Sequence, residues 1–378
     1  MKQVAILIIA LLAIGKGLMP DEAQATALAQ AETEYVLPTQ MCRGYFFVPV
    51  TLEVHEGDSP EARTLWFLYD TGASASYVDP DSIERVSGQS LDSGVRANFG
   101  TATSGDLHFT GLRARVRNLD HLSIALGREI DGILEFGAFA NVLLTLDYAN
   151  SEMRVVSGVL PRPDRQTVFD ANGPDDRPWI RIGFPGRNDR RLLIDSGAAL
   201  SPIILRRIDR YDTVAPPRTT GAAVRFSEVE ERRSARLRNS LWIGPNELEQ
   251  PIVQSTPETE ILGGQAMRHF SWTFDQRNER VRVIPNDPDT PVRFDPLVNH
   301  GMVLVPEGDG MRVSRVLTNS PAFDAGVEQG DFVTRFNGQS VRTRSCEMGS
   351  EPPSSMELTL LRRGETINIT LDLYPLVD

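Results

Sequence analysis

An internal repeat is the feature that most constrains this chain of 378 residues. The string LWFLYDTGAS around Asp70 recurs in outline as RLLIDSGAA around Asp195, 125 positions later. The layout downstream repeats as well, since Asp147 follows Asp70 by 77 positions and Asp275 follows Asp195 by 80. Chance does not easily produce both the motif and the spacing, so the sequence predicts a doubled fold.

The pattern within each half is typical of β-structure. Short apolar or alternating runs, such as residues 45–54, 108–116 and 237–243, are separated by Gly, Pro, Asn and Asp. Four prolines fall within residues 161–178 and another four within 285–296, which indicates two connections. We therefore expect a mainly β protein with parts at 35–158, 166–284 and 292–378.

The N-terminus has the pattern of a secretory signal peptide. Lys2 precedes an apolar run over residues 4–14, and Ala23-Gln24-Ala25 supplies small residues at a cleavage spacing. We expect residues 1–25 to be removed and the chain to be periplasmic or secreted, with an uncleaved anchor reaching Met19 as the alternative. Export permits a disulfide between Cys42 and Cys346, but two unpaired core cysteines are the favoured interpretation of so distant a pair.

Composition excludes several classes of function. The formal charge is -12 and no basic stripe appears, which disfavours nucleic-acid binding. Two cysteines exclude a zinc site built from several thiolates, and five scattered histidines form no His-x-x-x-His pair. We find no Walker motif, no dinucleotide glycine pattern and no Gly-x-Ser-x-Gly elbow. No metal or cofactor is expected.

Two aspartates at strand ends predict a specific chemistry. Asp70 and Asp195 each follow a strand-like apolar run and precede a hydroxyl residue and a glycine, as at a tight turn. If the two turns face each other, the carboxyl groups hold one shared proton, because like charges about 3 Å apart do not both ionise. Such a pair suits hydrolysis by an activated water. One Asp-Thr-Gly triplet is usually a surface turn, but the duplication favours function.

These residues resemble the aspartic proteases. DTGAS and DSGA look like the two catalytic loops of that family, and DGIL at 131–134 and ILGG at 261–264 look like its hydrophobic-hydrophobic-Gly motifs. The short halves are similar to a retropepsin-like dimer, or a small pepsin-like enzyme, fused into one chain. The resemblance implies catalytic roles for Asp70 and Asp195. It also implies a supporting role in the loops for Thr71, Gly72, Ser196 and Gly197.

The resemblance further implies a β-hairpin flap over the site. Residues 97–105, with Phe99, Gly100 and Thr101, are the expected flap of the first half, and an ordinary hairpin turn is the alternative. The second half has only the charged, glycine-poor stretch 221–233 there. One departure concerns Glu135, which stands where the second half has Gly263; Gly137 would take that place if the loop were shifted.

The C-terminal part resembles the PDZ domains of bacterial exported proteases. The string SPAFDAGVEQGD at 320–331 and Asn337-Gly338 carry the resemblance. It implies that the amides of Gly301, Met302 and Val303 hold the terminal carboxylate of a peptide. The alternative is a buried strand. The helix expected to wall the groove falls near residues 345–356, where Pro352 and Pro353 break it.

These observations lead to one hypothesis and one alternative. We expect an exported aspartic endopeptidase, a monomer that cleaves peptides or proteins and binds a C-terminal peptide at its PDZ domain. Membrane association is expected only if the N-terminal segment stays uncleaved. The alternative, favoured by Glu135, is a catalytically silent periplasmic adaptor that binds peptides.

Overall fold

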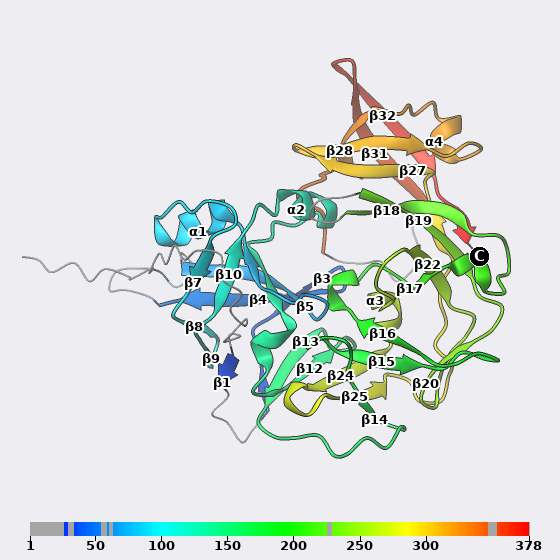
Figure 1. Cartoon of the computed structure of the whole chain (residues 1–378). Helices are drawn as coiled ribbons and strands as arrows, with labels where there is room; N and C mark the ends of the chain where they lie inside the picture. Colours follow the sequence, from blue (N-terminus) through cyan, green and yellow to red (C-terminus); the bar gives the residue numbers. More distant parts are fainter. Residues whose placement is uncertain are drawn as a thin grey trace, which may run out of the picture.

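The computed structural model describes residues 26–28, 34–53, 59, 63–224, 229–346 and 354–377 (Figure 1). The protein is mainly β, so the predicted class is confirmed. The predicted signal peptide, with its uncleaved alternative, lies outside the described residues. Across the described ranges, no helix has both the length and the hydropathy needed to cross a membrane.

A ten-stranded sheet dominates the first half. Its strands run in the order β1-β9-β8-β4-β5-β11-β6-β10-β7, with β3 paired to β4. The buried pattern of Leu65, Phe67, Leu68 and Tyr69 explains why β5 lies inside this sheet. The strands are β1 Thr26–Leu28, β3 Gln40–Cys42, β4 Tyr45–Leu52, β5 Thr64–Asp70, β6 Tyr77–Val78, β7 Arg96–Asn98, β8 Thr101–Ser104, β9 Leu107–Thr110, β10 Arg113–Val116 and β11 Gly132–Glu135.

The second half forms a seven-stranded sheet in the order β15-β16-β23-β17-β22-β19-β18. Its strands are β15 Trp179–Ile182, β16 Arg190–Ile194, β17 Ile203–Arg206, β18 Arg218–Val224, β19 Val229–Arg236, β22 Ile252–Thr256 and β23 Ile261–Leu262. A separate hairpin pairs β20 Leu241–Ile243 with β21 Asn246–Leu248.

The same pattern of strand pairing occurs in both halves. β5 runs parallel to β11, and β11 runs antiparallel to β6. In the second half β16 runs parallel to β23, and β23 runs antiparallel to β17. The repeat in the sequence is therefore a repeat in the fold, and each copy ends a buried strand at the aspartate of the motif.

A third sheet joins the halves. It runs in the order β14-β25-β24-β12-β13-β2, and β12 pairs with β24 across the boundary. Thr145 and Thr273 face each other at its centre, with their hydroxyl oxygens 2.9 Å apart. The halves are thus related by a pseudo-twofold axis at this pair. The strands are β2 Tyr35–Val36, β12 Leu143–Asp147, β13 Glu152–Val156, β14 Val168–Asp170, β24 Phe270–Asp275 and β25 Arg280–Pro285.

Short α-helices accompany the two halves in the part of the chain that the structure describes. Asp79 caps α1 by accepting the amide of Asp81, and Gly88 ends it in the left-handed conformation. The helices are α1 Pro80–Ser87, α2 Asp120–Leu126 and α3 Gly264–Met267.

The C-terminal part has its own sheet and core. The sheet runs in the order β27-β28-β29-β31-β32, with β30 on β29, and β26 pairs with β33. Ile124 of α2 belongs to this core, so the first half contributes a side chain to it. The elements are β26 Leu297–Asn299, β27 Met302–Glu307, β28 Gly310–Val316, α4 Pro321–Asp324, β29 Phe332–Phe336, β30 Gln339–Ser340, β31 Ser355–Arg362, β32 Glu365–Asp372 and β33 Tyr374–Val377.

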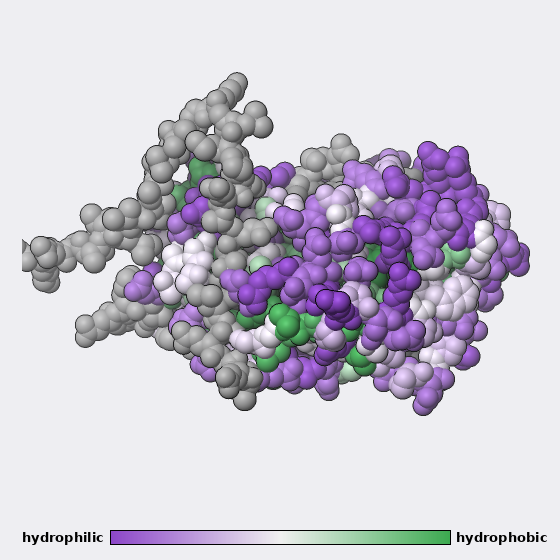
Figure 2. All heavy atoms as spheres, turned by 60° about the horizontal axis from the view of Figure 1, so that its bottom comes forward, coloured by the Kyte–Doolittle hydropathy of each residue, from purple (hydrophilic) through white to green (hydrophobic). Residues whose placement is uncertain are grey.

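The outer surface in view is mostly polar. Figure 2 shows hydrophobic side chains only in small groups among hydrophilic ones. The exposed large hydrophobic side chains among the described residues are Val36, Val95, Val159, Leu200, Val214, Ile284, Phe323 and Leu361. They are scattered along the sequence, as is normal for a folded protein in water.

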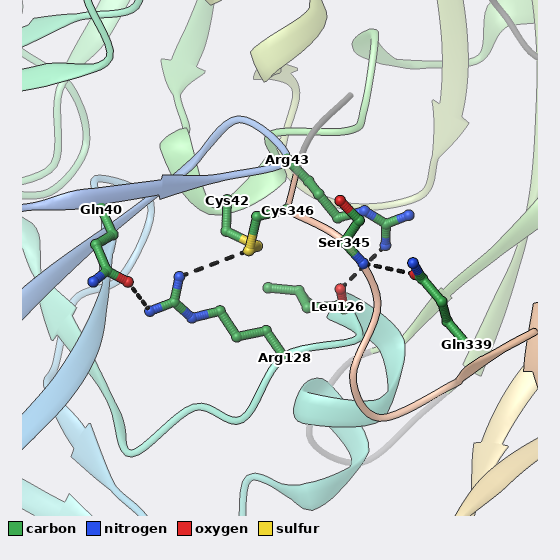
Figure 3. Close-up of a disulfide and its surroundings, with 8 residues drawn as sticks. All are labelled: Gln40, Cys42, Arg43, Leu126, Arg128, Gln339, Ser345 and Cys346. Atoms are coloured by element: carbon green, nitrogen blue, oxygen red, sulfur yellow. Dashed lines mark hydrogen bonds between the residues drawn. A yellow bond between two sulfur atoms is a disulfide. The ribbon is translucent and has the colours of Figure 1, made fainter. Parts of the chain in front are cut away.

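A disulfide ties the C-terminal part to the first half (Figure 3). Cys42, at the end of β3, is bonded to Cys346, with a sequence separation of 304. The Arg43 amide donates to the Cys346 carbonyl oxygen at 3.0 Å. The favoured interpretation of two unpaired cysteines is therefore wrong, because the fold brings together two segments whose distance in sequence says nothing about their distance in space.

Arginines strengthen the same junction at the C-terminal end of α2. Arg344 donates to the Ala125 carbonyl oxygen at 2.6 Å, and Arg43 donates to the Leu126 carbonyl oxygen at 3.2 Å. A helix leaves its last carbonyl groups without helical partners and carries partial negative charge there, so cationic donors stabilise this end.

We predict that removing the disulfide lowers the stability of the protein. Replacing both cysteines with alanine should reduce the free energy of unfolding by about 2–4 kcal/mol, because the unfolded chain gains freedom. Urea unfolding with and without reductant measures this. Reduction should lower the midpoint of the wild type and leave that of the double variant unchanged. Equal midpoints for the oxidised wild type and the variant would contradict the prediction.

Candidate functional site

The two aspartates of the repeat meet between the halves. Asp70 is the last residue of β5, and Asp195 follows the last residue of β16 directly (Figure 1). Each carboxyl group lies against the motif glycine of the other half, and each shifts the pKa of the other. The predicted encounter of the two motifs is therefore present in the structure.

Two buried hydroxyl groups hold the loops together in a crossed arrangement. The Thr71 amide donates to Ser196 Oγ at 3.0 Å, and the Ser196 amide donates to Thr71 Oγ1 at 2.9 Å. Each hydroxyl also donates across the boundary, Thr71 Oγ1 to the Ile194 carbonyl oxygen at 2.7 Å and Ser196 Oγ to that of Tyr69 at 3.0 Å. Neither buried hydroxyl is left unsatisfied, and the two loops are fixed against each other.

Each motif glycine makes room for the carboxyl group of the other half. A Cβ on Gly72 would lie 2.5 Å from Asp195 Cγ, and one on Gly197 would lie 2.4 Å from Asp70 Cγ. Both distances are shorter than any real carbon contact. The four supporting residues predicted from the sequence, Thr71, Gly72, Ser196 and Gly197, therefore all adjoin the carboxyl pair.

The surroundings favour a protonated pair. Burial raises the pKa of Asp70, opposed by the Gly72 amide and the hydrogen bond with Asp195. Burial, then the charge of Asp70 and its hydrogen bond, raise the pKa of Asp195 well above its usual range. Because the groups titrate as a unit, they retain one proton where isolated carboxyls have lost theirs. One member can then accept a proton while the other donates one.

The residues around the pair differ in burial. Asp70 and Asp195 are partly buried as whole residues, whereas Thr71 and Ser196 beside them are fully buried. The supporting bonds are therefore shielded from water. Within the described ranges, no cluster of three or more His, Cys, Asp or Glu side chains is placed to hold a metal ion.

Sequence reasoning missed two residues at the site. Arg177 donates to the Gly72 carbonyl oxygen at 2.9 Å, and its charge acts to lower the pKa of Asp70. Tyr45 is buried beside the pair, and burial raises the pKa of its hydroxyl to about 12. Arg177 falls in a proline-rich stretch interpreted as a connection, and Tyr45 in an ordinary apolar run, so neither carried a usable signal.

The structure clarifies the position of Glu135. Glu135 stands opposite Asp70 in the register of β11 and β5. In the second half, Gly263 directly follows the last residue pair of β16 and β23, which is the equivalent position. The loop is not shifted, so Gly137 does not take that place. A Cβ on Gly263 would lie 2.4 Å from two backbone oxygens, whereas the Glu135 amide donates to Ser76 Oγ at 3.1 Å. The first half accommodates a side chain here, and the carboxyl pair stays in contact.

The expected flap residues occupy a strand connection. Phe99 and Gly100 join β7 to β8, which begins at Thr101, and β8 forms a hairpin with β9. The turn of that hairpin lies at Gly105 and Asp106, at the far end of the predicted stretch. The Phe99 ring packs edge-on against Phe67, with centroids 6.2 Å apart. A closing role for these three residues stays a prediction.

The predicted carboxylate cradle lies at the start of β27. Gly301 has a left-handed φ of 88°, and a Cβ there would lie 2.1 Å from Ser320 Oγ, so only glycine fits. The Met302 amide donates to His300 Nδ1 at 3.0 Å, and burial lowers the pKa of His300 to about 4, which keeps the ring neutral as an acceptor. Met302 and Val303 are buried. The Met302 amide, one of those expected to hold the carboxylate, is therefore engaged within the protein.

Comparison with known proteins gives partial similarity. No family model matches the chain. A probable serine protease do-like of Buchnera aphidicola subsp. Acyrthosiphon pisum is 43% identical over 68 residues, 17% of this chain and 14% of that protein. The periplasmic serine endoprotease DegP of Escherichia coli K12 is 38% identical over 68 residues, again 17% and 14%. The chain thus spans about a seventh of the length of these curated relatives.

These names correct the predicted family and activity. The sequence led us to expect a retropepsin-like or pepsin-like aspartic protease, whereas the matched proteins are named serine proteases. The predictions of that family and of aspartic-type endopeptidase activity are therefore contradicted. A motif of a few residues indicated the chemistry of a carboxyl pair, which is a weaker statement than membership of a family. The names agree with a protease that acts on proteins, and they confirm the periplasmic, exported localisation.

We predict that Thr71→Val destabilises the protein. Valine keeps the shape of threonine but leaves the Ser196 amide and the Ile194 carbonyl oxygen buried without these partners, at about 1–3 kcal/mol each. Denaturant unfolding measures the loss. Thr110→Val, on the exposed face of β9, is the matched control and should change stability by less than about 0.5 kcal/mol. Equal effects of the two substitutions would show that the crossed bonds contribute nothing.

We also predict that the carboxyl pair makes stability fall as pH rises. The folded pKa of Asp195 is raised, so above about pH 4 the folded state keeps a proton that the unfolded state has released. This contribution is fully present below the unfolded pKa and is lost as pH rises through the folded pKa. In Asp195→Asn it is absent, so the variant should gain on the wild type between pH 4 and 7. Urea unfolding across this range tests it, with exposed Asp309→Asn as the control. A constant difference between variant and wild type would refute it.

Proposed function

We propose that this chain is an exported protease that acts on protein substrates, and that the carboxyl pair of Asp70 and Asp195 is a functional site in it. The observation that carries the proposal is the close, partly buried carboxyl pair fixed by crossed buried hydroxyls. The names of the relatives support proteolysis and protein substrates. Perturbed carboxyl pairs in an accessible position are the kind of group that proton-transfer catalysis uses.

The relatives are named serine proteases, but their similarity to this chain extends over a limited part of it. The matches extend over 68 to 70 residues, whereas Asp70 and Asp195 lie 125 positions apart. A stretch of that length does not include both aspartates. The similarity therefore leaves the role of the pair as a proposal that experiment decides.

The C-terminal part is proposed to bind peptides as a PDZ domain. In support, β27 is an edge strand that pairs only with β28 in its sheet, and such an edge can accept an added strand. β18 of the second half and α2 of the first lie next to β27 (Figure 1). An incoming peptide would thus meet both halves, which is a simple route by which substrate could be presented to them.

The proposal predicts that either aspartate is essential for cleavage. Asp70→Asn and Asp195→Asn should each lower the rate of cleavage of an unfolded protein at least a thousandfold, because an amide cannot exchange the shared proton. New amino termini counted by mass spectrometry measure the rate. Asp309→Asn, with a side chain 88% exposed, is the control and should keep full activity.

A covalent reagent separates the carboxyl pair from a serine nucleophile. A fluorophosphonate should leave the activity unchanged if Asp70 and Asp195 are the catalytic groups. Inhibition together with one labelled serine would overturn the assignment and favour the chemistry named for the relatives. Peptide binding without cleavage in the wild type would favour the adaptor instead.

A further inference from the structure

A cavity of about 560 Å³ in the second half is lined mainly by arginines. The guanidinium groups come from five positions, and a tyrosine adjoins them: Arg187, Arg190, Arg206, Arg207, Arg210 and Tyr211. This volume is within the usual range of small-molecule sites. Five arginines around one cavity are unexpected in a chain with a formal charge of -12.

The fold assembles this arginine pocket from separate strand ends. Arg190 begins β16, Arg206 ends β17, and Thr256 at the end of β22 pairs with Arg206 in register. β17 runs antiparallel to β23 and β23 parallel to β16, so the start of β16 lies at the same edge as the end of β17. Arg207 and Arg210 follow in the turn after β17.

The positive charge of the pocket is only partly neutralised. Glu260 is buried, bonded to Arg190 and 4.0 Å from Arg206 Nε. Among the residues that the structure describes, no carboxylate forms an ion pair with Arg187, Arg207 or Arg210. Of the five arginines, only Arg190 and Arg206 thus lie within 4.0 Å of a carboxylate among the described residues. Such an arrangement is unfavourable by itself and is stabilised by an anion.

Tyr211 and Arg207 have further features that are typical of a ligand site. The Tyr211 hydroxyl is buried and has no hydrogen-bond partner in the described part of the chain. The guanidinium carbons of Arg187 and Arg190 lie 4.9 and 5.8 Å from its ring centroid. Arg207 adopts a left-handed φ of 56°, which is strained for a residue with a side chain. Strain and unsatisfied polar groups are typical of ligand sites rather than of surfaces optimised for stability.

We propose that the arginine pocket binds a ligand that carries two or more phosphate groups. Guanidinium groups match phosphate oxygens in a two-pronged geometry, and several phosphates are needed to neutralise this excess of charge. A cavity of this volume suits compact phosphates better than an extended acidic peptide. The site is separate from the carboxyl pair, since β16 carries the chain from Arg190 to Ile194 over roughly 13 Å. The inference therefore goes beyond the proposed protease activity.

Calorimetric titration of the full mature chain with inorganic tripolyphosphate tests the proposal. We expect saturable binding that weakens as salt rises. The Arg207→Gln/Arg210→Gln double variant should bind at least tenfold more weakly. Arg293→Gln removes one charge from an exposed side chain outside the pocket and should bind like the wild type. Asp195→Asn should also bind like the wild type, so failure of the protease proposal would not affect this result.

Further experiments identify the source of the phosphate, and three results would refute the proposal. If the wild-type protein sediments with vesicles of phosphatidic acid in phosphatidylcholine and the double variant does not, the ligand is assigned as a lipid headgroup. Binding of tripolyphosphate alone would assign a soluble ligand. The proposal is overturned if tripolyphosphate does not bind at low salt, if the double variant binds equally well, or if a hexaglutamate peptide binds as tightly as tripolyphosphate.

Discussion

The crossed bonds between Thr71 and Ser196 are the constraint on which the candidate site depends. Each hydroxyl satisfies an amide and a carbonyl of the other half, in a place that water does not reach. The loops can approach this closely only because Gly72 and Gly197 lack side chains. The carboxyl groups are consequently held close together. They share one proton because two neighbouring carboxylates do not both ionise. The sheet centred on Thr145 and Thr273 supports the same axis.

The repeat could be predicted because it is local in each copy. A strand, an aspartate, a hydroxyl residue and a glycine appear within a few positions, and the equal spacing of Asp147 and Asp275 showed that whole halves correspond. Duplication also fixes the partner, since the only loop that can face the first copy symmetrically is the second. The meeting of Asp70 and Asp195 thus followed from sequence, and so did the β class.

Other features depend on contacts that no local pattern encodes. Cys42 and Cys346 are joined across 304 residues, and only the docking of the C-terminal part on α2 brings them together. Arg177 reaches Gly72 from a stretch that reads as a connection. The arginines of the pocket are divided between the start of β16 and the end of β17, so a search for a basic stripe along the sequence could not find them. The family prediction failed for a related reason, because a short motif specifies a site and not an ancestry.

β16 links the two charged sites and gives them opposite requirements. Its first residue, Arg190, lies in a pocket where positive charge is in excess, and its end positions Asp195, which lies where negative charge is in excess. The Arg190–Glu260 ion pair ties the start of β16 to the segment that leads into β23 and Gly263, the same segment that packs against the loop after Asp195.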